Sequence, residues 1–151
     1  GEYSLFMKNY ISKNFKVAFG QHSGIIDNNK DQYELPRFPI NEKYGDLNRF
    51  EFLIKLLPLQ FKYIFPKDKL LTENNNPPNM YIDFFEEQKN IHNINCFSNE
   101  SGLWKPTSVI LNNNKLNINF SEKFKFRRGR INCSLNDKGK WRWFGTQFTL
   151  Q

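Results

Sequence analysis

The sequence predicts an α+β protein in which an α/β-like first third is followed by an antiparallel β-sandwich-like domain. Two observations support this prediction. Apolar residues recur at helical spacing in segments before Pro58 and mostly alternate with polar residues beyond it. Short alternating runs then follow one another, with Asn- and Gly-containing turns between them. The change of period indicates a boundary between a first unit of residues 1–60 and a second unit of residues 61–151.

The first third is predicted to contain two helices with extended segments between them. Apolar side chains recur at helical spacing in residues 2–14. A second apolar stripe follows Asp46, a good N-cap residue, and ends at Pro58. Residues 15–20 form an apolar run typical of a short buried strand, and residues 35–40 are expected to be extended because prolines disfavour helix there.

The remainder is predicted to form short strands joined by tight turns. Turn residues at 112–114 and 136–139 favour two β-hairpins. On the last strand, Trp141 and Trp143 share one face, and we expect that face to be the core. The alternative is an exposed aromatic surface. The expected strands cover residues 59–66, 80–85, 94–97, 107–111, 115–120, 130–135 and 140–150.

Composition narrows the class of protein. Aromatic residues make up 17% of the chain and include 16 Phe, so large side chains can build a core in a chain that is only 38% hydrophobic. No run of about 18 apolar residues occurs, so no membrane span is expected. The N-terminus has no charged segment followed by an apolar run, so no signal peptide is expected in this chain.

Positive charge is concentrated near the C-terminal end. The net charge is +7, and residues 122–142 hold eight basic residues against Glu122 and Asp137. Basic residues among aromatic ones suit nucleic acid, an acidic glycan or a membrane surface. The alternative is a solvated strand face. No recognisable nucleic-acid motif accompanies the charge, so no specific nucleic acid is expected as a partner.

Two cysteines, Cys96 and Cys133, lie in the strand-like runs INCF and INCS. Their spacing matches neither a zinc site nor a redox motif. They are either buried free thiols or a disulfide between neighbouring strands, and export of the protein would favour the disulfide. Such a bond would close a loop of roughly 37 residues.

Residues that could hold a metal are few. The chain has two histidines, His22 and His92, and the carboxylates Asp83, Glu86 and Glu87 are expected to be solvated charges at a strand end. The spacing of these histidines and carboxylates does not match that of a metal site, so neither a metal site nor a cofactor is predicted in this chain. The sequence also contains neither a glycine-rich phosphate loop nor a serine nucleophile elbow.

Six motifs occur in order along nearly the whole chain: GEYS (1–4), AFGQHSG (18–24), ELPRFPINEKYGDL (34–47), INCFSNESG (94–102), GRINCSL (129–135) and GKWRWFGTQF (139–148). The first three resemble the end of the catalytic domain of NodB-homology polysaccharide deacetylases. The last three resemble the β-rich extension found in a bacterial subgroup of that family. The resemblance implies that residues 1–60 are a C-terminal remnant of a distorted deacetylase barrel, followed by the β-rich domain.

The resemblance also implies a chemistry. The family is a class of hydrolases that removes acetyl groups from glycans with a divalent metal held by an Asp-His-His set. Nothing in this chain resembles the TFDD and HxxxH motifs that supply the metal ligands, and Gly1, Glu2 and Tyr3 match only the tail of a PYGEY-like motif. The chain alone is therefore expected to be inactive and to need an N-terminal catalytic half. The resemblance further implies a polysaccharide partner and a periplasmic or extracellular location.

Candidate site residues follow from the motifs. His22 lies after an expected barrel strand and could act as general acid, although it departs from the family pattern and could instead bond within its own turn. Arg37, between two prolines, is either structural or on the substrate side. Trp104 is the candidate exposed platform for a sugar ring, with Arg142 as a second glycan-binding residue.

Two further functions stay open at this point. The chain could be a non-catalytic carbohydrate-binding β-sandwich, or it could bind nucleic acid through its basic stretch. A barrel remnant would leave apolar faces and strand edges exposed. We therefore expect it to pack on the β-domain or to form a homo-oligomer.

Overall fold

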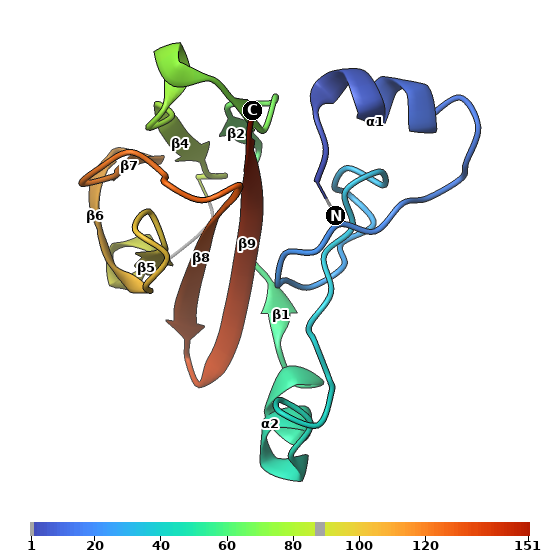
Figure 1. The fold of residues 1–151 in the computed structure, drawn as a ribbon. Coiled ribbons are helices and arrows are strands. Elements are labelled where there is room, and N and C mark those ends of the chain that lie inside the picture. Colours follow the sequence, from blue (N-terminus) through green and yellow to red (C-terminus); the bar gives the residue numbers. More distant parts are fainter. Residues whose placement is uncertain (1, 87–89) are drawn as a thin grey trace.

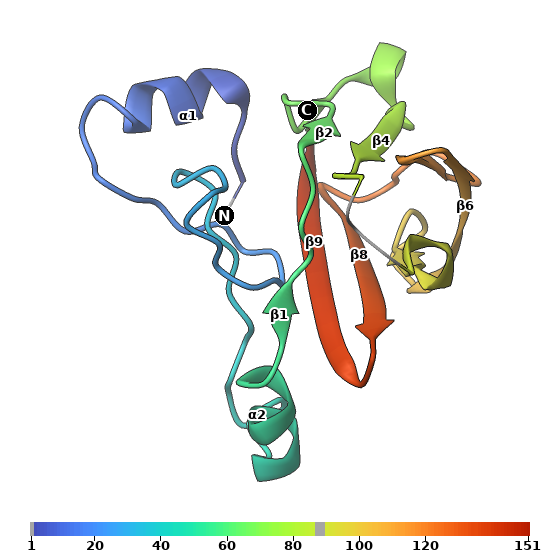
Figure 2. The ribbon, with the colours of Figure 1, turned by 180° about the vertical axis from the view of Figure 1, so that it is seen from behind.

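The computed structural model describes residues 2–86 and 90–151, and within them the chain forms one curled, mixed, nine-stranded sheet with an N-terminal segment beside it (Figure 1). The view from behind places the same segment along β1 (Leu57–Pro58) and β9 (Lys140–Leu150) (Figure 2). This arrangement confirms the α+β class. Gly1 and Glu87, which entered the predictions, lie outside the described residues.

Both predicted helices form, each over a shorter range. Helix α1 spans Leu5–Ile11, and its N-cap Ser4 accepts a hydrogen bond from the Met7 backbone N–H. Helix α2 spans Leu47–Leu53, and Asp46 caps it as predicted, since its side chain accepts from the Arg49 backbone N–H at 2.9 Å. The helices are short because most of their apolar side chains are exposed, and packing supplies most of the stability of a short helix.

The predicted strand over residues 15–20 is wrong. In its place a single parallel bridge joins Phe19 to Leu35. The backbone N–H of Gly20 donates to the Leu35 carbonyl at 2.8 Å, and the Leu35 N–H donates to the Ala18 carbonyl at 2.9 Å. Parallel strands occur mainly where both faces of a sheet are covered, and among the described residues no further strand pairs with these two extended segments.

The strands run in the order β1-β9-β8-β5-β6-β7-β4-β2, and β3 also pairs with β9. Strands β1 and β3 are parallel to β9, and every other pair is antiparallel. Short 3-10 turns occupy Glu73–Asn75 and Ile91–Asn93. The strand bounds are β1 Leu57–Pro58, β2 Tyr63–Phe65, β3 Leu70–Leu71, β4 Met80–Asp83, β5 Asn95–Ser98, β6 Lys105–Asn112, β7 Lys115–Asn119, β8 Arg128–Asp137 and β9 Lys140–Leu150.

Both predicted hairpins are present. The turn between β6 and β7 contains Asn113 at a φ of 53°. The turn between β8 and β9 contains Lys138 at 52° and Gly139 at 83°. Two consecutive left-handed residues are typical of the type I′ turn, whose twist matches that of the flanking strands.

One curled sheet takes the place of the predicted two-sheet sandwich. The start of β6 pairs with β5 and its end pairs with β7, so the two halves are continuous. Residues 57–71 close the curl, because β1 and β3 pair with β9 while the intervening β2 pairs with β4 at the other end of the sheet. The core lies inside the curl and draws on both halves, including Met80, Ile82, Leu116, Ile118, Ile131, Leu135 and Phe148.

The prediction that Trp141 and Trp143 pack with the core of β8 is wrong. In the β8–β9 register, Trp143 lies opposite Ser134 and Trp141 opposite Asn136. Directly opposite residues share a face, so both tryptophans lie on the outer face of the sheet. The inner face of β9 is supplied instead by residues such as Phe144 and Phe148, which contact the core.

Cys96 and Cys133 are joined by a disulfide that links β5 to β8. The two residues lie directly opposite each other in the sheet register. Both side chains are buried in the core, at 3% and 0% exposure. The bond therefore fixes two neighbouring strands in the middle of the strand order.

Candidate functional site

The N-terminal segment is fixed to the outer face of β9 by close backbone contact. A Cβ placed on Gly145 would lie 2.0 Å from the backbone oxygen of Ser23, so the segment can approach the strand only because residue 145 is glycine. Further along β9, the Tyr3 backbone N–H donates to Thr149 Oγ1 at 3.3 Å. Glu2 completes the docking through ion pairs with two arginines at the start of β8.

The parallel bridge brings two loops to the same edge. Gln21 and Ser23 follow one extended segment, and Arg37 follows the other. The Arg37 backbone N–H donates to the His22 carbonyl at 3.0 Å, and its side-chain Nε donates to the Gly20 carbonyl at 3.2 Å. The carboxyl ends of parallel segments are where α/β proteins bind their ligands, so this edge is a natural location for a site.

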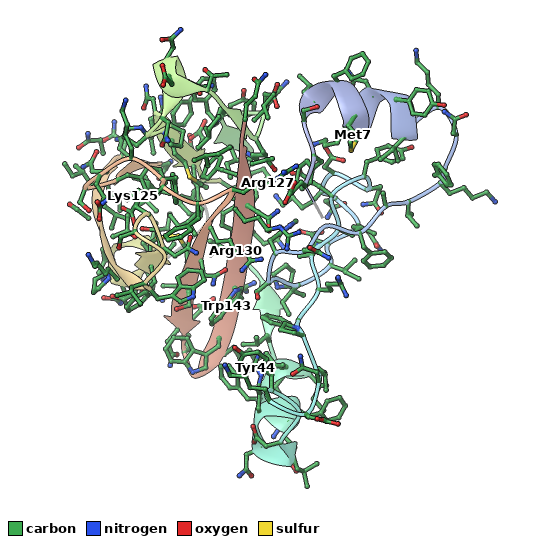
Figure 3. The ribbon with its side chains drawn as sticks, in the orientation of Figure 1. Met7, Tyr44, Lys125, Arg127, Arg130 and Trp143 are labelled. Carbon is green, nitrogen blue, oxygen red and sulfur yellow. A yellow bond between two sulfur atoms is a disulfide. The ribbon has the colours of Figure 1, made fainter. Side chains whose placement is uncertain are left out.

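A groove of about 500 Å³ opens at this edge, between the N-terminal segment and the outer face of β8 and β9. Figure 3 shows Arg130, Trp143 and Tyr44 one below another along this boundary. Trp104, from the loop before β6, completes the lining. The groove residues are Gln21, Ser23, Arg37, Phe38, Pro39, Tyr44, Arg49, Phe52, Leu53, Trp104, Arg130, Asn132 and Trp143.

The groove combines aromatic rings with unneutralised positive charge. It is lined by three arginines, and none of the described residues that line it is acidic. The ring of Phe38 lies edge-on to Trp143, with centroids 5.8 Å apart, and the Arg49 guanidinium carbon lies 5.6 Å from the centre of the Tyr44 ring.

Two hydrogen-bond donors of the groove are buried without an acceptor among the described residues. They are Arg49 Nε and Trp143 Nε1. Buried donors are almost always paired in folded proteins, and an unpaired one needs an explanation such as a bound ligand or water. An arrangement of donors, cations and ring faces suits a ligand that brings acceptor oxygens and a flat apolar face.

The structure brings together two of the predicted site residues and separates a third. Arg37 and Trp104 line the same groove. Arg142 points elsewhere, because its side chain donates to the Pro58 carbonyl and to Asp137 Oδ2, each at 3.2 Å. Arg142 therefore joins β1 to the β8–β9 turn and does not belong to the groove.

Sequence reasoning missed Arg49, Arg130 and Tyr44 as site residues. Arg49 lies in the predicted second helix and was not singled out there, and Arg130 was counted with the basic stretch of residues 122–142. The available signal was the recurrence of aromatic and arginine residues between positions 37 and 52. It points to the groove only when that segment is known to lie against β8.

His22 does not line the groove; it lines another cavity and is 5% exposed. Burial, reinforced by the positive charges of Lys69, Arg130 and Lys8, lowers the pKa of the imidazole to about 4. A histidine with this pKa is neutral at pH 7 and holds no extra proton to donate. The burial of this side chain favours a role in packing residues 21–24 against the sheet, and the role of general acid stays a prediction.

A second cavity, of about 390 Å³, lies on the other side of residues 21–24. Several of its charged groups have protein partners: Lys8 pairs with Glu34 at 2.9 Å and with Asp31 at 2.5 Å. Buried Lys69 donates to the Pro66 carbonyl, and burial lowers the pKa of its amine to about 8. Because these cations already have protein partners, the aromatic groove is the stronger candidate site.

The buried histidine makes stability depend on pH. The pKa of His22 is about 4 in the folded protein and about 6.5 unfolded, so the unfolded state binds more protons between these values. Stability should therefore fall by about 2–3 kcal/mol as the pH drops from about 6.5 to 4. Urea unfolding across this range should show a flatter profile for His22→Gln. As a control, His92→Gln at an exposed position should leave the pH dependence of stability as it is in the parent protein. An equal effect of both substitutions would contradict the assignment of this pH dependence to His22.

The basic stretch of residues 122–142 is not one continuous patch. Arg127 and Arg128 pair with Glu2 at 2.6 and 3.0 Å, and Lys125 pairs with Glu122 at 2.5 Å. Lys125 lies away from Arg127 and Arg130 (Figure 3). Glu122 and Asp137 are already counted in the charge of this stretch, so among these ion pairs Glu2 is the one carboxylate that lies outside it. Of the basic residues in this stretch, Arg130 is the one that lines the groove.

Within residues 2–86 and 90–151, no three His, Cys, Asp or Glu side chains are grouped so that they could hold a metal ion. The same residues contain no helix that is long and apolar enough to cross a membrane. Comparisons of the chain with protein-family models, with curated proteins and with solved structures gave no match. The resemblance to polysaccharide deacetylases therefore stays a prediction that depends on the sequence motifs.

Proposed function

We propose that this chain supplies the C-terminal part of an exported, metal-dependent polysaccharide deacetylase. The single observation that carries the proposal is the composition of the groove. Ser23 and Arg37 come from motifs that resemble the catalytic domain, while Trp104 and Trp143 come from the β-rich part. One site built from both units suits an enzyme in which the β-rich domain helps to hold the glycan.

The position of the groove supports this function. It lies at the carboxyl ends of two parallel segments, where barrel enzymes bind substrate. Its aromatic side chains offer faces on which sugar rings can stack. In this proposal Arg37 is a substrate-side residue and His22 holds the loop that presents Ser23.

Exposed apolar surface on the N-terminal segment also supports a larger catalytic domain. Among the described residues, 14 of the 22 exposed large apolar side chains lie in residues 5–54. Soluble proteins rarely leave so many in one region, so a covering layer is expected. Further barrel elements would supply that layer. The side chains are Leu5, Phe6, Met7, Tyr10, Phe15, Val17, Phe19, Ile26, Ile40, Tyr44, Leu47, Phe50, Phe52 and Ile54.

The described residues do not fit a metal site, so this part of the chain is assigned no step at the metal. In the proposed enzyme the metal would supply an activated water for amide hydrolysis. The residues described here would bind the glycan and orient its chain. Activity therefore requires metal ligands contributed by a catalytic half outside residues 1–151.

Acetate release tests the proposal. The chain should be expressed alone and joined in frame to the coding sequence that precedes it, and each protein assayed on acetylated chito-oligosaccharides with and without a metal chelator. The 151-residue chain should release no acetate, and the longer protein should release acetate until the metal is chelated. A folded longer protein that releases none with any of several divalent metals and acetylated glycans would contradict the proposal.

A non-catalytic carbohydrate-binding module is the second candidate function. The observation that favours it is that the 151-residue chain builds the groove without another chain. The same two proteins distinguish the candidates. Glycan binding by the short chain without acetate release by the longer one would favour the binding module.

A further inference from the structure

The three arginines of the groove leave their charge available to a ligand. Arg37 donates to the Gly20 carbonyl, Arg130 donates to Gln147 Oε1 at 3.1 Å, and Arg49 lies over the Tyr44 ring. None of the three forms an ion pair with a carboxylate of the described residues. The other arginines of the chain, Arg127, Arg128 and Arg142, do form such pairs, so the groove collects the arginines that have no carboxylate partner among the described residues.

The unneutralised charge lies beside aromatic faces and buried donors. Trp104 is 47% exposed at the rim, and Trp143 lies deeper, against Phe38. The donors Arg49 Nε and Trp143 Nε1 are buried and lack acceptors among the described residues. A ligand that satisfies all of these groups must carry a flat face, several acceptor oxygens and negative charge.

We propose that the groove binds an anionic saccharide, a sugar chain that carries carboxylate or sulfate groups. A planar guanidinium binds the paired oxygens of a carboxylate or sulfate more strongly than it binds a hydroxyl group. A neutral sugar would use the ring faces and leave three guanidinium groups without a counter-charge. The volume of about 500 Å³ is within the range of ordinary small-molecule sites and accommodates a short stretch of such a chain.

This inference rests on the proposed function, because it names the class of glycan that the enzyme would bind. It narrows the substrate from acetylated polysaccharides in general to those that also bear acidic groups. A nucleic acid shares the negative charge and the flat rings, so it is an outcome that the experiment must distinguish. Binding to nucleic acid through dispersed charge falls steeply with salt concentration.

Titration of the 151-residue chain, followed by tryptophan fluorescence and calorimetry, tests the inference. The probes are oligogalacturonate, a chondroitin sulfate oligosaccharide, a neutral chito-oligosaccharide and single-stranded DNA, each at 50 and 300 mM salt. At least one acidic oligosaccharide should bind at least tenfold more tightly than the neutral one at both salt concentrations. Preference for oligogalacturonate would identify the carboxylate as the charged group, and preference for chondroitin sulfate would leave sulfate as the required group.

Charge-matched variants localise the binding. Arg37→Gln and Arg49→Gln should each weaken binding of the acidic oligosaccharide about tenfold or more. Lys140→Gln removes one positive charge from the exposed β8–β9 turn, outside the groove, and should leave the affinity within twofold. Near-ultraviolet circular dichroism establishes that each variant keeps the parent fold. Trp143→Phe keeps a ring face but removes the indole N–H donor, and should weaken binding by a smaller factor than Arg37→Gln or Arg49→Gln does.

Three results would overturn the inference: equal or tighter binding of the neutral oligosaccharide, an effect of Lys140→Gln as large as that of Arg37→Gln, or tight binding of DNA alone that disappears at 300 mM salt. The acetate-release assay is independent of these titrations. Binding of the acidic oligosaccharide by the short chain would support the inference even if the longer protein released no acetate. Acetate release without such binding would leave the deacetylase proposal in place and remove this one.

Discussion

Replacement of Gly145 with alanine is expected to destabilise the protein by about 3 kcal/mol or more and to remove the groove. The added Cβ would lie 2.0 Å from the Ser23 backbone oxygen and 2.5 Å from Asn132 Oδ1. The first contact cannot relax easily, since it is to backbone, whereas the second is to a side-chain end that can move. The loop of residues 21–25 must therefore move away from β9. Urea unfolding gives the loss of stability, and titration with the acidic oligosaccharide gives the loss of the site.

Gly139→Ala is the matched control for this prediction. A Cβ at residue 139 would meet nothing within 4 Å, but the backbone there has a φ of 83°. The cost should therefore be limited to the left-handed backbone, about 1–2 kcal/mol, and binding should be unchanged. If Gly145→Ala costs no more than Gly139→Ala and retains the groove, the close contact between Ser23 and β9 does not form in solution.

Removal of the disulfide by Cys96→Ala and Cys133→Ala should cost about 3–4 kcal/mol. The bond spans 37 residues and joins β5 to β8 in the middle of the sheet. Without it the unfolded chain regains the entropy that the closed loop had removed. The loss adds to the small one expected from shortening two buried side chains. Guanidinium unfolding of the parent and of the double variant measures the difference.

A reductant control separates the bond from the lost side-chain volume. Unfolding of the parent protein in reductant should reproduce most of the loss seen in the double variant and should not affect that variant further. Mass measurement after alkylation, with and without reductant, reports whether the bond is formed. Two alkylated cysteines in the unreduced protein, or a loss below about 1 kcal/mol, would contradict the prediction.

Local features of the fold were predictable from the sequence because local patterns determine them. The turns at 112–114 and 136–139 contain residues that tolerate a left-handed backbone, and Asp46 is a strong helix cap. The curl of the sheet was not predictable. It depends on β1 and β3, which are two residues each and pair with a strand far along the chain. Such pairings leave no periodic signal in a sequence.

The orientation of the tryptophans shows a second limit. Residues 145–149 of β9 are all buried, because the core covers one face and the N-terminal segment covers the other. A strand buried on both faces loses the alternation by which its inner face could be recognised. The prediction therefore placed Trp141 and Trp143 in the core.

The candidate site was predictable only in part, because local sequence patterns single out individual residues but do not show which segments lie together. Arg37 and Trp104 stood out individually, since one lies between prolines and the other in a loop beside Gly102. Their proximity depends on the docking of two segments that no local pattern relates. Arg142 belongs to the basic stretch that was expected to bind glycan, but it lies on the face of β9 opposite to Trp143.

The way residues 57–71 cross the sheet also bears on aggregation. Long unpaired strand edges are templates to which other chains add. In the described part of this protein the outermost strands, β1, β2 and β3, are two or three residues long, so they offer no run of backbone groups on which another strand could extend. Self-association of this chain should therefore occur through the apolar side chains of the N-terminal segment. Covering that segment should be enough to keep the protein in solution at high concentration.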